Sequence, residues 1–122
     1  MGDSAKVDIW VGVRAEDADI DGLIAKLPKD MFDESGHDVF LKEDVDRVMT
    51  KYGCVLERVS CSGDEIGFGI IVFSHDWDYG AAPFNALDIS QQIETEMRKL
   101  RELFRRFGIT DSIGTWCQTD FR

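Results

Sequence analysis

The chain has 122 residues, a formal net charge of −10, and apolar and charged fractions of 43% and 31%. A chain of this length buries roughly 65% of its unfolded surface without metal or disulfide support, so we expect one domain over residues 1–122. The negative charge argues against nucleic acid and anionic membrane as partners, and no apolar run approaches the roughly 20 residues that span a bilayer.

The first part of the chain predicts a strand followed by a short helix. Apolar and polar residues alternate over residues 7–14, which is typical of a strand with one buried face. Apolar residues at helical spacing follow over residues 20–27. Asp17 or Asp19 can cap the start of this helix, and Pro28 limits its end.

The middle of the chain predicts a loop, a second helix and a hairpin. Residues 29–38 are polar and are expected to form a loop, and residues 45–52 have the apolar spacing of a helix that ends at Gly53. Two strand-like segments come next, over residues 54–61 and 65–74, joined by a Ser-Gly-Asp turn.

The last part predicts a loop, a long helix and a closing strand. Turn-forming residues dominate positions 75–83. A long apolar stripe then predicts a helix that begins at Asn85 or Asp88 and stops at Gly108. Residues 112–121 alternate in the manner of a strand.

This order of elements is the ferredoxin-like βαββαβ plan. The predicted fold class is therefore α+β, a two-layer sandwich in which an antiparallel sheet carries its helices on one face. The divided first crossover adds an extra short helix to that plan.

The cysteines indicate a reducing compartment. Cys54, Cys61 and Cys117 are an odd number, and the amino terminus lacks the order of a signal peptide, so we expect a cytoplasmic protein without disulfides. No Cys-x-x-Cys spacing occurs, and we expect neither metal nor cofactor. Burial as small apolar residues is the favoured interpretation; a catalytic thiol would need His37 or His75 as its base.

Glycines and large aromatic residues fall together on the sheet face opposite the long helix. An exposed platform of this kind would suit a second copy of the chain, with Trp10 and Trp116 as the contact residues of a homodimer. Alternatively, the second short helix or the loop after residue 75 covers this face and makes it a second core. The platform residues are Trp10, Gly12, Gly67, Gly69, Ile71, Phe73, Gly114 and Trp116.

The loop after residue 75 is a candidate partner-binding segment, because aromatic residues beside carboxylates suit a protein interface. Its candidate contacts are Asp76, Trp77, Asp78 and Tyr79. A plain surface loop is the alternative. A metal site is a further one, although the segment lacks the Asp-x-Asp-x-Asp-Gly spacing of a calcium loop.

The acidic excess lies in the first eighty residues and is densest over residues 16–46, which hold eleven carboxylates and three lysines. Such a surface attracts a basic partner, and Asp33, Glu34 and Asp38 are its candidate contacts. A solvated surface that keeps the protein soluble is the other interpretation. No nucleotide-binding, phosphate-binding, zinc-protease or serine-hydrolase motif occurs, so we expect no enzyme.

Two short stretches resemble known bacterial families. The opening Val7-Asp8-Ile9-Trp10-Val11-Gly12 resembles the first strand of an immunity-protein family encoded beside polymorphic toxins. The segment from Leu100 to Phe121, with Gly114-Thr115-Trp116, is similar to the closing helix and strand of the ribonuclease E inhibitor called regulator of ribonuclease activity B. Both resemblances imply a small acidic protein that binds and blocks another protein.

We therefore expect a non-enzymatic inhibitor or immunity protein that blocks a basic partner, such as a nuclease toxin, by electrostatic mimicry of its substrate. A dimeric small-molecule-binding or sensor domain of ferredoxin-like type is the alternative, and a metal-dependent or thiol enzyme is a third hypothesis.

Overall fold

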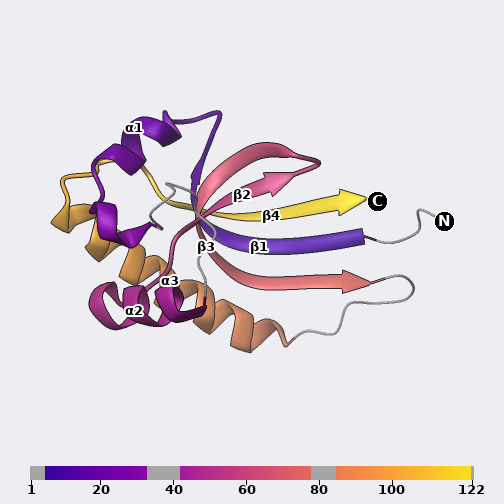
Figure 1. Ribbon diagram of the computed structural model, residues 1–122. Coiled ribbons are helices and arrows are strands. Elements are labelled where there is room, and N and C mark those ends of the chain that lie inside the picture. Colours follow the sequence, from indigo (N-terminus) through magenta and orange to yellow (C-terminus); the bar gives the residue numbers. More distant parts are fainter. Residues whose placement is uncertain (1–4, 33–41, 78–84, 122) are drawn as a thin grey trace.

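Four strands form one antiparallel sheet in the computed structural model, which describes residues 5–32, 42–77 and 85–121 (Figure 1). The strand order is β2-β3-β1-β4, and every neighbouring pair is antiparallel. The strands are β1 (Ala5–Arg14), β2 (Glu57–Cys61), β3 (Asp64–Trp77) and β4 (Gly114–Phe121).

The helices of the described residues lie in the two long connections, between β1 and β2 and between β3 and β4. The fold class is therefore α+β, as predicted. The helices are α1 (Ile20–Ala25), the 3₁₀ helix η1 (Lys29–Met31), α2 (Lys42–Tyr52) and α3 (Ala86–Arg106). Within the described ranges, no helix has the length and apolarity that crossing a membrane requires.

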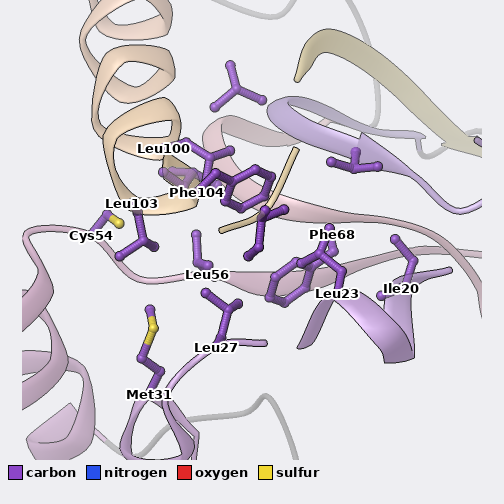
Figure 2. Packing of buried hydrophobic residues seen from close by; sticks show 14 of the residues in the cluster. Ile20, Leu23, Leu27, Met31, Cys54, Leu56, Phe68, Leu100, Leu103 and Phe104 are labelled. Carbon is purple, nitrogen blue, oxygen red and sulfur yellow. The ribbon is translucent and has the colours of Figure 1, made fainter. Parts of the chain in front are cut away.

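One apolar core joins the helices to a single face of the sheet, which makes the architecture two-layered (Figure 2). Leu100, Leu103 and Phe104 of α3 pack toward side chains from β1, β3 and the first crossover. The alternation of β1 places Val11 and Val13 on this face, so its polar and aromatic residues fall on the other. The remaining members of the core are Ile20, Leu23, Leu27, Met31, Val48, Cys54, Leu56, Phe68, Ile70 and Ile109.

The long helix follows its sequence signals. Asn85 is the N-cap, and its side chain accepts hydrogen bonds from the backbone N–H groups of Leu87 and Asp88. The helix ends before Gly108, whose φ of 70° lies in the left-handed region that favours glycine. Of the two predicted caps, Asn85 is therefore the one used.

The boundaries of β3 differ from the prediction. His75, Asp76 and Trp77 were expected in a loop, but they pair with the first three residues of β1 and extend β3 to fourteen residues. Backbone pairing with β1 satisfies their N–H and C=O groups, which outweighs the turn-forming tendency of the side chains. The rest of that predicted loop, residues 78–83, lies outside the described residues.

Smaller differences occur at three other elements. The helix α1 ends at Ala25 rather than Leu27, because Lys26 and Leu27 turn more tightly and bond to carbonyls three residues back. Part of the predicted loop after Pro28 is the short helix η1. The strand β2 begins at Glu57, because the preceding residues enter the core without pairing.

The hairpin turn contains two residues, Ser62 and Gly63, with φ of 53° and 83°. Positive φ at both central positions is the type I′ geometry, whose twist matches that of the flanking strands. Asp64, predicted as part of the turn, is the first residue of β3.

Glycine residues lie side by side on the neighbouring strands β3, β1 and β4. Gly12 pairs with Gly69 on one side and with Gly114 on the other. A Cβ atom on Gly69 would lie 2.0 Å from the Val11 carbonyl oxygen, and one on Gly12 would lie 2.1 Å from that of Phe68. Only glycine fits at this pair, and glycine at such a position is typical of a sharply bent sheet.

The bend folds the β2–β3 hairpin back over the face opposite the helices (Figure 1). At the hairpin tip, the Ser62 hydroxyl donates to Asp120 Oδ1 of β4 at 2.9 Å. Gln118 Nε2 of β4 donates to Cys61 Sγ at 3.3 Å. The two edge strands therefore meet, and Trp10 between them is 1% exposed.

A bulge in β3 changes the predicted platform. Ile9 pairs with Phe73 while Trp10 pairs with Ile71, so Val72 is an extra residue in β3. Phe73 consequently shares the face of Ile9 and not, as predicted, that of Trp10.

The glycine crossing predicts a strong dependence of stability on Gly69. We expect Gly69→Ala to lower the free energy of unfolding by about 3 kcal/mol, because its Cβ would contact backbone that cannot move aside. Urea unfolding followed by circular dichroism measures the change. Gly63→Asn is the control, since the site is open and Asn tolerates positive φ. Equal losses in the two variants would contradict this account of the bend.

A polar cluster ties η1 to α2. The Asp30 carboxylate accepts hydrogen bonds from Lys51 Nζ and Tyr52 Oη, and Arg47 donates to the Asp30 carbonyl at 2.8 Å. The hydrogen bond from Lys51, followed by that from Tyr52, lowers the pKa of Asp30 below its ordinary value of 3.8. The same contact with Asp30 raises the pKa of Lys51 above 10.5.

This cluster predicts a pH-dependent contribution to stability. A lowered carboxyl pKa means that Asp30 stabilises the fold above about pH 4, and that this stabilisation is lost as the pH falls through the folded pKa. Asp30→Asn should therefore melt below the wild type at pH 7, and the gap between them should narrow as the pH falls to about 2.5. Thermal unfolding at both pH values, with Asp46→Asn as an unpaired control, measures this. A gap that stays equal at both pH values would exclude the mechanism.

Candidate functional site

A cleft of about 890 Å³ lies between α1 and the connection from α3 to β4. We call it the α1 cleft. Its floor is apolar, and its rim carries three carboxylates, one lysine and a tryptophan. The lining residues are Val13, Asp17, Ala18, Asp19, Gly22, Leu23, Lys26, Thr110, Asp111, Ser112, Ile113, Gly114 and Trp116.

The sheet topology brings these distant segments together. Because β1 and β4 are antiparallel neighbours with Gly12 opposite Gly114, the residues that follow β1 and those that precede β4 meet at one end of the sheet. Figure 1 shows α1 and the connection after α3 at that end.

One wall of the cleft is a stack of aromatic, cationic and acidic groups. Trp116 Nε1 donates to the Gly12 carbonyl at 3.1 Å, which orients the indole. The Arg14 guanidinium lies 4.4 Å from the centroid of this ring. Asp17 accepts from Arg14 Nε at 2.7 Å and from a terminal nitrogen at 3.3 Å, and this hydrogen bonding raises the pKa of Arg14.

Two carboxylates of the rim have no cation of their own. Within the described residues, neither Asp19 on the α1 side nor Asp111 on the opposite wall forms an ion pair, and the same holds for Lys26. Asp19 is the N-cap of α1 but makes no side-chain cap hydrogen bond; a Cβ on Gly22 would lie 2.6 Å from its Oδ2. The exposed side chains of Glu16 and Asp21 extend the negative surface beyond the rim.

The chain neutralises part of its own acidic run. Asp17 pairs with Arg14, Asp21 with Arg58 at 3.0 Å, Asp30 with Lys51, and Asp44 with Arg47 at 3.8 Å. The predicted continuous negative surface is thus interrupted by internal ion pairs over the described residues. The uncompensated carboxylates at this end of the sheet are those of the α1 cleft.

The same connection borders a second, smaller hollow of about 510 Å³ on its other side. Arg101 and Arg105 of α3 line this hollow, and Arg105 donates to both carboxylate oxygens of Glu102, at 2.6 and 2.8 Å. Asp111 also lines this hollow, so the hollow carries charges of both signs and shares Asp111 with the α1 cleft.

The predicted contact residues do not gather at this cleft. Asp33, Glu34, Asp38, Asp78 and Tyr79 lie outside the described residues. Asp76 and Trp77 end β3, where Asp76 pairs with Lys6, near the opposite end of β1. Gly12 lies six positions after Lys6 in β1, about 20 Å along the strand.

The two tryptophans predicted for a sheet-face interface lie together but differ in exposure. Their ring centroids are 6.1 Å apart, with Trp10 buried and Trp116 half-buried. Gly67 of the folded-back hairpin lies against the Trp10 ring, where a Cβ atom would come within 2.1 Å of the ring; residues 78–83 of the predicted covering loop lie outside the described residues. Asp8 shares this inner face and is 6% exposed; its Oδ1 and the Trp10 Nε1 have no hydrogen-bond partner among the described residues.

The structure bears on the catalytic thiol and the metal site that the sequence left as alternatives. Burial raises the pKa of Cys54 to about 11, so its thiol is protonated at neutral pH. Cys117 is exposed on β4. Across residues 5–32, 42–77 and 85–121, no three His, Cys, Asp or Glu side chains are grouped so as to hold a metal ion.

The pair Asp19 and Asp111 was missed as a site from the sequence. Asp19 was interpreted only as a helix cap, and Asp111 falls in a short connection. The signal that could have found the pair was topological. In the predicted plan the first and last strands are antiparallel neighbours, so aspartates just after the first strand must lie near those just before the last strand.

Comparison with known proteins adds no functional assignment: the chain matches no protein-family model, and neither a curated protein nor a solved structure is significantly similar to it.

The different burial of the cysteines predicts that their thiols react at different rates. At pH 8 an aromatic disulfide reagent should react first with Cys117, and Cys54 should react at least about a hundredfold more slowly, since burial and a pKa of about 11 suppress its thiolate. Absorbance of the released thiolate follows the reaction. A Cys61→Ser/Cys117→Ser variant isolates Cys54, and rapid labelling of that folded variant would refute its burial.

Proposed function

We propose that this protein is a non-enzymatic inhibitor or immunity protein that binds a basic partner, such as a nuclease toxin, and covers its cationic site. The observation that carries the proposal is the rim of the α1 cleft, where Asp19 and Asp111 have no internal cation and lie beside a half-buried tryptophan. A net charge of −10 surrounds this rim with a field that attracts cationic surfaces.

The mechanism divides between charge and apolar contact. The net negative charge, together with exposed carboxylates such as Asp19 that form no ion pair within the described residues, steers a basic partner toward this end of the sheet. Trp116 and the apolar floor of the cleft then supply contact area, because exposed ion pairs contribute little affinity by themselves. Asp33, Glu34, Asp38, Asp76, Trp77, Asp78 and Tyr79 remain further proposed contacts.

We also propose the ferredoxin-like plan as the finer description of the fold. The strand order, counted from the other edge, is β4-β1-β3-β2, with β2 and β3 joined as a hairpin and helices in both long connections. The resemblances to the toxin immunity family and to regulator of ribonuclease activity B agree with a small acidic inhibitor, and they remain part of the proposal.

A small-molecule-binding or sensor domain is the second candidate. The volume of the α1 cleft, about 890 Å³, lies within the range of small-ligand sites. Dimerisation through the inner sheet face would have to use Trp116 alone, because Trp10 is enclosed.

The inhibitor proposal predicts a salt-dependent interaction with a gene neighbour's product. Each neighbouring gene is expressed in a bacterial host with and without this chain; one product should be toxic alone and tolerated with the chain. For that purified pair, stopped-flow association should slow at least about tenfold between 50 and 500 mM salt, because screening removes the steering field.

Paired charge reversals locate the interaction. Asp19→Lys/Asp111→Lys should slow association at least about tenfold and weaken protection. Asp64→Lys/Asp88→Lys changes the net charge equally, at exposed positions without ion pairs in the described structure, and should have a much smaller effect. If no neighbour's product binds, or if association ignores salt, the inhibitor proposal fails.

A further inference from the structure

We infer that the α1 cleft is a receptor for one arginine side chain of the basic partner. This inference rests on the proposed function and gives it a recognition chemistry. It starts from a cleft whose lining combines apolar residues with acidic groups.

The floor suits the methylene stem of a long cationic side chain. Ala18, Ile113 and Trp116 are half-buried and supply apolar surface in the cleft, whereas the core residues Val13 and Leu23 add little exposed surface. Long basic side chains bury their stems against apolar surface while the charged group stays near the rim. A cleft of about 890 Å³ admits such a side chain together with its flanking backbone.

The rim supplies a charge that the chain itself does not cancel. Asp19 and Asp111 belong to opposite walls, and Lys26, which also lines the cleft, pairs with neither in the described structure. A cation placed between the walls interacts with both carboxylates at once. Asp19 is exposed and Asp111 is half-buried, so the two carboxylates together, and not either one alone, supply the attraction.

The neighbouring wall favours a guanidinium over an ammonium group. Arg14 already stacks on the Trp116 ring while its planar fork holds Asp17 through two nitrogens. A second planar guanidinium offers five donors, enough to bond carboxylates on two walls, and it stacks on flat groups. An ammonium is a compact point charge and cannot span the walls in the same way.

The test is a titration of the full-length chain with N-acetyl-L-arginine amide, followed by ¹H–¹⁵N NMR. We expect saturable shifts confined to α1, residues 110–114 and the Trp116 indole N–H, with a millimolar Kd, as suits a ligand of this size. N-acetyl-L-citrulline amide has nearly the same shape without the charge and should bind at least about tenfold more weakly. The lysine analogue should also bind more weakly.

Two matched double variants distinguish the effect of the two rim carboxylates on binding from the effect of net charge. Asp19→Asn/Asp111→Asn should weaken arginine amide binding at least about tenfold, whereas Asp64→Asn/Asp88→Asn, with the same change in net charge, should leave it unchanged. The absence of saturable shifts up to about 50 mM, equal binding of the citrulline amide, or equal losses in the two variants would overturn the inference.

The two proposals fail separately. If arginine amide does not bind but a neighbouring gene's product is still inhibited, the arginine receptor is overturned and the inhibitor proposal stands. If arginine amide binds in the cleft but no basic partner is found, the inhibitor proposal is overturned and a site for a small organic cation remains.

Discussion

The close approach of β1 and β3 at Gly12 and Gly69 shapes the rest of the molecule. No side chain fits between these backbones, so the sheet bends there and the β2–β3 hairpin folds over the inner face. Trp10 is enclosed by that fold, and the Gly12 carbonyl receives the hydrogen bond that orients Trp116. The orientation of the cleft's aromatic wall therefore depends on the backbone packing of β1 against β3.

Internal ion pairs explain how so acidic a chain tolerates its own charge. Like charges in the run over residues 16–46 repel one another, which opposes compaction. Arg14 holds two of these carboxylates, those of Glu16 and Asp17, and Arg58, Lys51 and Arg47 each hold one. The surplus is not spread evenly, because the α1 cleft keeps two carboxylates without such a cation.

The periodic spacing of apolar residues in the sequence was sufficient to predict much of the fold. The alternation in β1, the apolar stripe and caps of α3, and the Ser-Gly turn each depend on neighbouring residues, and each was predicted correctly. Features that depend on pairing with a neighbouring strand were not predicted. The bulge at Val72 and the extension of β3 through Trp77 are set by pairing with β1. The cleft joins Asp19 to Asp111, about ninety residues apart, so its signal lay only in the predicted topology.

Steering and affinity depend on different parts of this surface. Exposed carboxylates such as Asp19 act at long range but are screened by salt and add little to a formed complex. A carboxylate beside the apolar floor acts only at contact, where partial exclusion of water strengthens it. Salt should therefore slow the encounter with a basic partner more than it speeds dissociation. This separation follows from the geometry: Asp19 at the start of α1 is exposed, whereas Asp111 in the connection to β4 is half-buried.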